Sequence, residues 1–492
     1  MKNKFLSFLQ RETNFTSTEN GAIALKTTNS QLLDLFGCIG SLRTRDNTDI
    51  ERLFSMAFSE DTLLATKMAF YARNIRGGLG ERRTFRIILK YLSQVAPEIV
   101  IKNFDAIALF GRYDDFYTLV DTSIEEAMWA YLKDQFDLDM ENYKNGQPIS
   151  LLAKWLKSVN ASSAETTRLG KLTARHFNLS EKAYRQTLSK LRQYIDVTEV
   201  KMSAQNWSDI AYGHVPSRAM SIYHKAFKAH DEEGFNNYLN AVTRGDAKVN
   251  ASTLYPYDIL GQLGLSITSS HFSFYHYDAL LEEQWKSLPN YVTGEHNILV
   301  MADTSGSMTG RPMHSSIGLA LYFAERNQGA FKDTFMTFSS KPSFIQVKGK
   351  TLYDKIKCIP SIVENTDLEA AFNLILAVAV KNRLSTDELP ASLVVITDME
   401  FDSATTSRGN WTFYDSMVKN YAAHGYTMPN VIFWNVASRH DVFQASSNYK
   451  GVQMASGQSP SVFKSILANM GKSPYDAMLS VLNDPMYDLI TV

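Results

Sequence analysis

The sequence predicts a protein of α plus α/β class, with an all-helical, repeat-like domain over residues 1–290 and a doubly wound, mostly parallel α/β domain over residues 291–492. Three observations lead to this prediction. Helix-start patterns follow one another up to about residue 290. After Gly294, short apolar runs rich in β-branched and aromatic residues alternate with helical stretches. Finally, 45% of the 492 residues are apolar and only 13 are proline, which provides large cores and little linker.

The helical part contains several helix starts. Ser123 and Glu126 have the spacing of a capping box, Ser180 precedes a helical stretch, and Pro216 with Ser217 opens another. We see no strand pattern and no strict sequence repeat across this part. A long series of short helices is typical of a bundle or of a HEAT-like helical solenoid, and we expect the solenoid.

The α/β part shows six short apolar runs that read as strands and four helical stretches between or after them. The expected strands are residues 297–302, 334–338, 343–347, 393–397, 430–436 and 451–455, and the expected helices are 314–327, 367–380, 412–424 and 462–470. Such alternation favours a mostly parallel sheet with helices on both faces. Ligands of such sheets bind at the carboxyl ends of the strands, so the loops after the strands are the ones to search.

Composition excludes several classes of protein. With 50 Lys and Arg against 51 Asp and Glu, the chain is neither a globally basic nucleic-acid coat protein nor an acidic disordered tail. Its two cysteines, Cys38 and Cys358, provide neither a disulfide framework nor a cysteine-ligated zinc site. Residues 1–6 lack the apolar core of a signal peptide, and residues 374–380, the longest apolar run, are too few to span a membrane. We therefore expect a cytoplasmic protein without membrane contact.

Oxygen-bearing side chains follow two of the expected strands and precede one helix. Asp303, Ser305 and Ser307 come directly after the first strand, Thr366 precedes the second expected helix, and Asp398 follows the fourth strand. These segments would meet at one edge of the sheet. Carboxylates and hydroxyls suit a hard divalent cation that keeps several waters, so we expect Mg²⁺ or Mn²⁺ rather than Zn²⁺. The same letters also make a good turn and helix cap.

The three segments resemble the metal-ion-dependent adhesion site of the von Willebrand factor A domain, whose pattern is Asp-x-Ser-x-Ser, then Thr, then Asp. The resemblance implies that Ser305, Ser307 and Thr366 are hydroxyl ligands and that Asp303 and Asp398 are direct or water-mediated carboxylate ligands. It also implies an A-type fold for residues 291–492 and an open metal position that accepts an acidic group of a protein partner. Such a site binds and does not catalyse.

Catalytic motifs fail on spacing, so we expect no enzyme. Ser307 lacks the glycines two positions before and after it that a nucleophile elbow needs. Residues 349–351 match the last three residues of a P-loop motif, but Phe344 occupies the position of the glycine that the motif requires. A metal-dependent hydrolase stays open as an alternative, because Asp367, Glu400 and Asp402 lie near the metal motif in sequence.

Charge is unevenly distributed along the helical part. Residues 66–90 carry seven basic side chains against Glu81 alone, and residues 151–200 carry nine basic against four acidic ones, interleaved with Trp155, Phe177 and Tyr184. Cations neutralise phosphates while aromatic rings stack on bases, as single-stranded RNA binding requires. The alternative is solvated helix faces with aromatic residues in the core. The candidate RNA-binding residues are Arg73, Arg76, Arg82, Arg83, Arg86, Lys154, Lys171, Arg175 and Arg185.

A helical-repeat half followed by an A-type domain resembles the Ro ribonucleoprotein family, whose TROVE module binds small non-coding and misfolded RNAs. Residues 73–83 and 111–116 are similar to short segments of that family. The layout also resembles uncharacterised proteins of plants, viruses and phages, through residues 152–156, 184–188 and 207–210. We therefore expect an RNA-binding protein with a magnesium-dependent partner site. A metal-dependent protein scaffold without a nucleic-acid role is the alternative.

Overall fold

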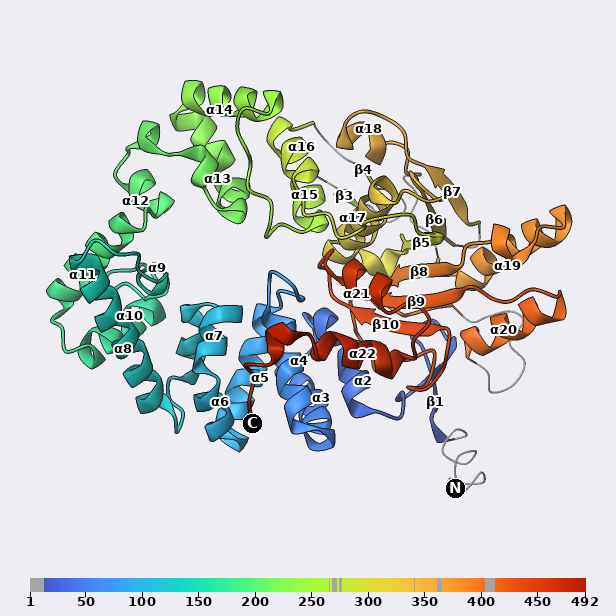
Figure 1. The fold of residues 1–492 in the computed structure, drawn as a ribbon, viewed down its shortest axis with the longest axis horizontal. Coiled ribbons are helices and arrows are strands. Elements are labelled where there is room, and N and C mark those ends of the chain that lie inside the picture. The colour runs from blue at the N-terminus through green and yellow to red at the C-terminus, as the bar shows by residue number, and fades with distance from the viewer. Residues whose placement is uncertain are drawn as a thin grey trace. The chain divides into compact units, whose positions relative to one another are not determined.

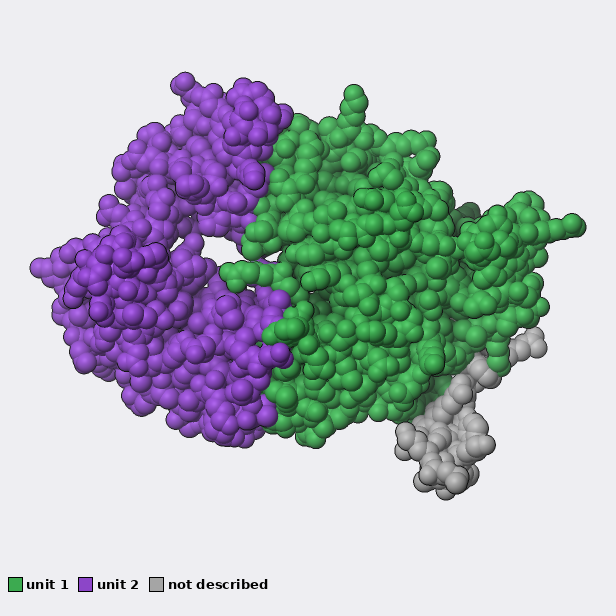
Figure 2. Space-filling model, in the orientation of Figure 1, with its two compact units in different colours: residues 1–72, 76–81, 251–485 green, residues 73–75, 82–250, 486–492 purple. Residues whose placement is uncertain are grey.

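The computed structural model describes residues 13–264, 266–267, 272–273, 277–339, 341–360, 365–402 and 412–492 (Figure 1). The chain forms two compact units (Figure 2). The first, here called the sheet unit, comprises Met1–Ala72, Arg76–Glu81 and Ala251–Pro485. The second, here called the helical unit, comprises Arg73–Ile75, Arg82–Asn250 and Met486–Val492.

The sheet unit is built on a six-stranded sheet with the order β10-β9-β8-β5-β6-β7. Neighbouring strands run parallel, except that β7 is antiparallel to β6 at one edge. The strands are β5 (Ile298–Asp303), β6 (Thr334–Phe338), β7 (Ser343–Gln346), β8 (Ser392–Thr397), β9 (Asn430–Asn435) and β10 (Val452–Ser456). All six expected strands are therefore present, and the mixed, mostly parallel sheet is confirmed.

The strands of the sheet interior are apolar because both faces are covered. Every residue of the inner strands β5, β6 and β8 is buried, and so is every residue of the edge strand β10. Helix α17 packs against three of these strands and against α15, and its middle is buried on all sides. The helices of this part are α15 (Pro256–Gln262), α16 (Ala279–Lys286), α17 (Arg311–Arg326), α18 (Leu352–Ile356), α19 (Leu368–Asn382), α20 (Phe413–Ala423), α21 (Val462–Ala468) and α22 (Pro474–Leu482). Short strands β3 (Ser266–Ile267) and β4 (Phe272–Ser273) pair between α15 and α16.

The N-terminal segment belongs to the sheet unit, and it begins with strands rather than helices. A hairpin of β1 (Phe15–Ser17) and β2 (Ile23–Leu25) is followed by α2 (Gln31–Phe36), α3 (Asn47–Glu60) and α4 (Thr62–Arg73). Leu25 and Phe443 exchange backbone hydrogen bonds, and the Ser456 hydroxyl donates to the carbonyl of Phe36 at 2.8 Å. The hairpin corrects the expectation that residues 1–290 hold no strand. The compact units also divide the chain differently from the predicted boundary at residue 290.

Short helices make up the helical unit, and consecutive helices such as α10 and α11, or α13 and α14, are in contact. They are α5 (Arg82–Val95), α6 (Pro97–Lys102), α7 (Phe104–Phe110), α8 (Glu125–Lys144), α9 (Leu152–Trp155), α10 (Ala164–His176), α11 (Glu181–Tyr194), α12 (Thr198–Ser203), α13 (Ser217–His230) and α14 (Glu232–Arg244). A longer 3₁₀ segment, η2 (Tyr113–Leu119), follows α7. None of the helices in the described ranges combines the length and apolarity that crossing a bilayer requires.

Two of the three expected helix starts are found where they were predicted. The Ser180 hydroxyl accepts a hydrogen bond from the backbone N–H of Ala183 at 3.2 Å, and α13 begins after Pro216. The expected capping box at Ser123 is wrong, because α8 begins at Glu125 and its N-cap is Ile124, which offers no side-chain acceptor. Ser123 instead lies 3.4 Å from the carbonyl of Ser93.

Candidate functional site

The topology of the sheet selects one place for a ligand. Strand β6 lies on one side of β5, and β8 lies on the other, so the chain changes direction between β5 and β8. In doubly wound sheets, the connections that follow two such strands leave in opposite directions. A crevice that can hold a ligand therefore opens between the carboxyl ends of the two strands. Asp303 is the last residue of β5, and Asp398 directly follows β8. The two expected carboxylates therefore stand side by side at the switch point.

Asp303 is fully buried and held by its own loop and by the end of β8. Its Oδ1 accepts from the backbone N–H of Ser305 at 2.9 Å, and its Oδ2 accepts from the hydroxyl of Thr397 at 2.7 Å. The hydroxyls of Ser305 and Ser307 lie 3.0 Å apart. Ser305 is buried and Ser307 is exposed, so the loop after β5 presents its oxygen atoms from the interior toward solvent.

Asp398 completes a pair of buried carboxylates. It is 1% exposed, and its Oδ1 accepts from the backbone N–H of Glu400 at 3.2 Å. Burial raises the pKa of both Asp303 and Asp398, and the charge of Asp398 raises the pKa of Asp303 further. A hydrogen bond from Ser307 lowers the pKa of Asp398, which shows that the two loops meet. Two carboxylates that disfavour each other's charge in a buried place are the electrostatic setting in which a cation is most stabilising.

Thr366 is linked to this edge of the sheet by hydrogen bonds to Asp402 and not to Asp303 or Asp398. Its backbone N–H donates to Oδ2 of Asp402 at 3.1 Å, and the N–H of Asp402 donates to the carbonyl of Thr366 at 3.1 Å. Asp402 follows Asp398 in the loop after β8. The structure thus brings Asp303, Ser305, Ser307 and Asp398 together directly. Thr366, which is 2% exposed, is tied to the same loop.

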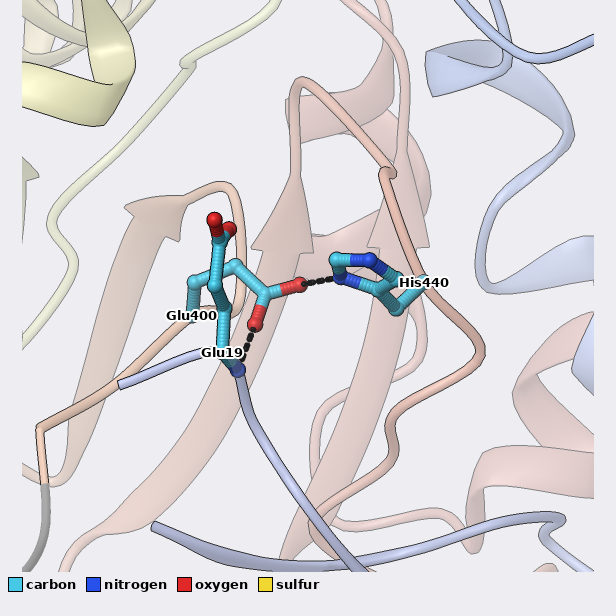
Figure 3. Close-up of side chains that lie close together, drawn as sticks. All are labelled: Glu19, Glu400 and His440. Carbon is cyan, nitrogen blue, oxygen red and sulfur yellow. Dashed lines mark hydrogen bonds and ion pairs between the residues drawn. The ribbon is translucent and has the colours of Figure 1, made fainter. Parts of the chain in front are cut away.

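Two residues of the loop after β9, Arg439 and His440, also reach this edge. Arg439 Nη2 lies 3.0 Å from Oδ2 of Asp398, and its Nη1 lies 2.8 Å from the carboxylate of Glu19. In Figure 3, Glu400 lies between Glu19 and His440: its carboxylate accepts from the N–H of Glu19 at 2.6 Å and lies 2.8 Å from Nδ1 of His440. Glu400 is fully buried, whereas Glu19 and His440 are exposed.

A carboxylate oxygen of Glu19, a carboxylate oxygen of Glu400 and a ring nitrogen of His440 lie within 4.8 Å of one another. Three such atoms could bind one metal ion. Sequence reasoning missed Arg439 and His440, although the rule of strand carboxyl ends applied to β9 would have found them. Glu19 had no such signal, because it stands 381 positions before Glu400. Together these loops form an acidic edge with one arginine and one histidine beside five carboxylates, those of Glu19, Asp303, Asp398, Glu400 and Asp402.

Two of the RNA-binding candidates are placed differently from the expectation. Arg73 is only 4% exposed, and its guanidinium lies 2.8 Å from Oδ2 of Asp115. Arg86 lies 2.6 Å from Oδ1 of Asp115 and 2.9 Å from Asp114. These two candidate RNA-binding residues are therefore not free cations, because ion pairs within the helical unit neutralise both guanidinium groups.

The other candidates are accessible. Arg76, Arg82, Arg83, Lys171, Arg175 and Arg185 are exposed, and Lys154 is half-buried. Lys171 lies 3.4 Å from Glu181. Two of the interleaved aromatics are core residues rather than stacking surfaces, because Phe177 is 2% and Tyr184 is 0% exposed. Trp155 is half-buried and has the guanidinium of Arg112 3.8 Å from its ring centre.

Comparison with known proteins places the chain among proteins whose function is not described. The model of the domain of unknown function DUF2828 matches residues 18–138 and 156–295, and that of the domain of unknown function DUF7788 matches residues 297–481. The chain is similar to "Uncharacterized protein L728" of Acanthamoeba polyphaga mimivirus, with 28% identity over 516 aligned residues, which cover 95% of this chain and 87% of the relative. Because the DUF2828 model matches more than half of its residues, this chain belongs to the DUF2828 family.

Proposed function

We propose that this protein is a non-enzymatic, Ro-like RNA-binding protein whose sheet unit holds a divalent cation for contact with a partner. The helical unit is then a TROVE-like, HEAT-like repeat domain that binds single-stranded or structured non-coding RNA. The sheet unit is a von Willebrand factor A-type domain. Support for the A-type domain comes from the Asp-x-Ser-x-Ser loop after β5, from Thr366 before α19 and from Asp398 after β8, at the switch point of a mostly parallel sheet.

One observation carries the metal site: Asp303 and Asp398 are buried next to each other, and both have raised pKa values. Burying two like charges is costly unless a cation offsets them. The surrounding groups are hydroxyls of Ser305 and Ser307, which are ligands for Mg²⁺ or Mn²⁺ rather than for Zn²⁺. When bound, the ion would supply an open coordination position to an acidic group of a protein partner, while the residues of the two loops orient it.

Calorimetric titration of the EDTA-treated protein with MnCl₂ and MgCl₂ tests this site. We expect the double variant Asp303→Asn, Asp398→Asn to lose detectable binding and to keep its fold, because the substitution removes two buried like charges and leaves the packing unchanged. Asp246→Asn, an exposed carboxylate of the helical unit, is the matched control and should bind as the wild type does. Unchanged affinity in the double variant would show that the cation does not bind here.

The RNA-binding part is supported by exposed arginines on α5, α10 and α11, among them Arg82, Arg175 and Arg185. The purified protein should bind single-stranded RNA at low salt, and the affinity should fall steeply as salt is raised, because phosphate contacts release counterions. Absence of RNA binding in 50 mM salt, about the lower end of the usual range, would overturn this part.

A metal-dependent protein scaffold is the second candidate, and the ion pairs of Arg73 and Arg86 favour it because they leave fewer free cations for RNA. The scaffold predicts that a partner protein is released by EDTA and by Asp303→Ala, with no effect of added RNA. The RNA-binding function predicts nucleic acid in the purified sample and insensitivity of that binding to EDTA.

A further inference from the structure

Five cationic side chains of the helical unit gather around the start of α5, the segment before η2 and helix α9. They are Arg82 and Arg86 of α5, Arg112, Lys154 of α9, and Lys157, here called the α5–α9 cationic cluster. Arg82 interacts electrostatically with Arg86 and Arg112, and Lys157 interacts with all three arginines. Lys154 and Arg112 both lie over the ring of Trp155, at 5.6 and 3.8 Å from its centre. Three separate elements therefore direct positive charge to one place.

Two acids hold part of the cluster in a fixed position. Asp114 accepts two hydrogen bonds from the guanidinium of Arg112, at 2.9 and 2.8 Å, and also lies 2.9 Å from Arg86. Asp115 pairs with Arg86 from the other side, at 2.6 Å. The guanidinium of Arg112 also stacks on an aromatic ring, that of Trp155, 3.8 Å from the ring centre. A guanidinium that is fixed by a bidentate pair and a stacked ring loses little freedom when it binds a further group.

The acids do not neutralise the cluster. Among the described residues, the side chains of Arg82, Lys154 and Lys157 form no ion pair, and Asp114 is shared between two arginines. Partial burial followed by the charges of neighbouring arginines lowers the pKa of Arg82, and burial also lowers the pKa of Lys157. Like charges held this close favour an anionic ligand that enters from solvent.

We infer that the α5–α9 cationic cluster binds backbone phosphates of single-stranded RNA. The inference rests on the proposed RNA-binding function and names its contact surface. Phosphate oxygens fit the arginine forks of Arg82 and Arg112, and the spread of cations over three elements suits successive phosphates of one strand. The half-buried indole of Trp155 gives the same strand an aromatic surface next to these charges. An acidic peptide would use the cations but not the ring.

Fluorescence anisotropy with a labelled oligouridine of 12 nucleotides, titrated with the full chain, tests this inference. The double variant Arg82→Ala, Lys157→Ala removes two cations that form no ion pair with the described part of the chain. We expect at least about a tenfold loss of affinity at low salt and a salt slope smaller by about 1.4, because each of these cations neutralises one phosphate of a single strand. The control, Lys225→Ala with Lys228→Ala, removes two exposed cations from α13 and should stay within about twofold of the wild type.

Competitors identify the ligand chemistry. Unlabelled oligouridine should displace the label, whereas inorganic phosphate at equal ionic strength should displace it weakly, because it offers one phosphate instead of several. If oligoglutamate of equal length competes as well as RNA does, the surface is a site for acidic peptides and the inference is overturned.

The variants separate the two levels of the proposal. Wild type that binds no oligouridine at low salt overturns the proposed RNA-binding function. Wild type that binds, with an equal loss in both double variants or a loss only in the control, overturns the α5–α9 site and leaves the RNA-binding function standing. Circular dichroism of each variant establishes that the helical unit is folded.

Discussion

Arg439 is the residue that most directly balances the acidic edge. Its guanidinium joins Asp398 to Glu19, at 3.0 and 2.8 Å, and its side chain is 34% exposed. The arginine thus supplies at Asp398 part of the positive charge that a divalent cation would bring. A cation that binds at Asp398 and Asp303 must compete with this ion pair.

Arg439→Gln should therefore increase the affinity for Mn²⁺ by about tenfold, a change that corresponds to about 1.4 kcal/mol. Calorimetric titration of the EDTA-treated protein measures it, and Arg244→Gln, which removes an exposed arginine of the helical unit, is the matched control. A lower affinity in Arg439→Gln would mean that the arginine positions Asp398 for the metal instead of competing with it.

The positions of residues relative to one another could be predicted from sequence where the residues are close in the chain. Asp303, Ser305 and Ser307 lie in one loop, so their spacing alone placed them together, and the strand rule added Asp398. Arg73 could not be placed in this way. Its burial depends on Asp115, which stands 42 positions away and comes from the segment after α7. Charge counting along the chain does not reveal which arginines are already paired.

At the scale of elements, the six strands of the large sheet were found within two residues of their ends. Five of them run parallel to a neighbour and are largely buried, and such strands read as short apolar runs. The hairpin of β1 and β2 was missed. Its strands have three residues each and only one fully apolar member between them, β2, so no alternating pattern develops. Its place beside the sheet depends on pairing with Phe443, which is a long-range contact without a local signal.

Gly40 allows the segment after α2 to approach β10. A Cβ atom at Gly40 would lie 2.6 Å from the backbone of Gly457 and 2.8 Å from that of Ser456. We expect Gly40→Ala to destabilise the sheet unit by about 1–3 kcal/mol, because backbone atoms cannot move aside as a flexible side chain can. Hydrogen exchange measured by mass spectrometry should show faster exchange over residues 31–41 and 452–456.

Gly213→Ala is the matched control for this substitution, since a Cβ there would meet only the carbonyl of Lys248 at 3.9 Å. Its exchange should equal that of the wild type in both segments. Unchanged exchange in Gly40→Ala would mean that the N-terminal segment is not packed against β10.

At the scale of the molecule, the sheet unit is assembled from separate stretches of the chain. The stretch up to Ala72 contributes the hairpin, α2 and α3, and residues from Ala251 onward contribute α15, α16 and the sheet. Helix α15 packs on α17, where Gly318 comes so close that a Cβ would lie 2.8 Å from Pro256. The family models divide the chain near residue 296, yet the core of the sheet unit extends across that division.

A fragment of residues 291–492 should therefore be unstable, because it lacks α15 and the N-terminal segment and exposes the buried face of α17. We expect it to aggregate or to unfold at a clearly lower temperature than the sheet unit of the full chain. Thermal unfolding followed by circular dichroism measures this difference. A fragment with a cooperative transition at the temperature of the full chain would contradict the discontinuous core.

The distance in sequence between Gly40 and Ser456 also determines when the sheet unit can be completed during synthesis. Their hydrogen bond joins residues 416 positions apart. At about 5–20 residues per second, a ribosome needs roughly 20 to 80 seconds to supply β10 after the N-terminal segment has emerged. Residues 82–250 leave the ribosome in between. Residues 82–250, the main part of the helical unit, can thus fold first. Until β10 is synthesised, the strand edge of the nascent N-terminal hairpin stays unpaired and open to chaperones.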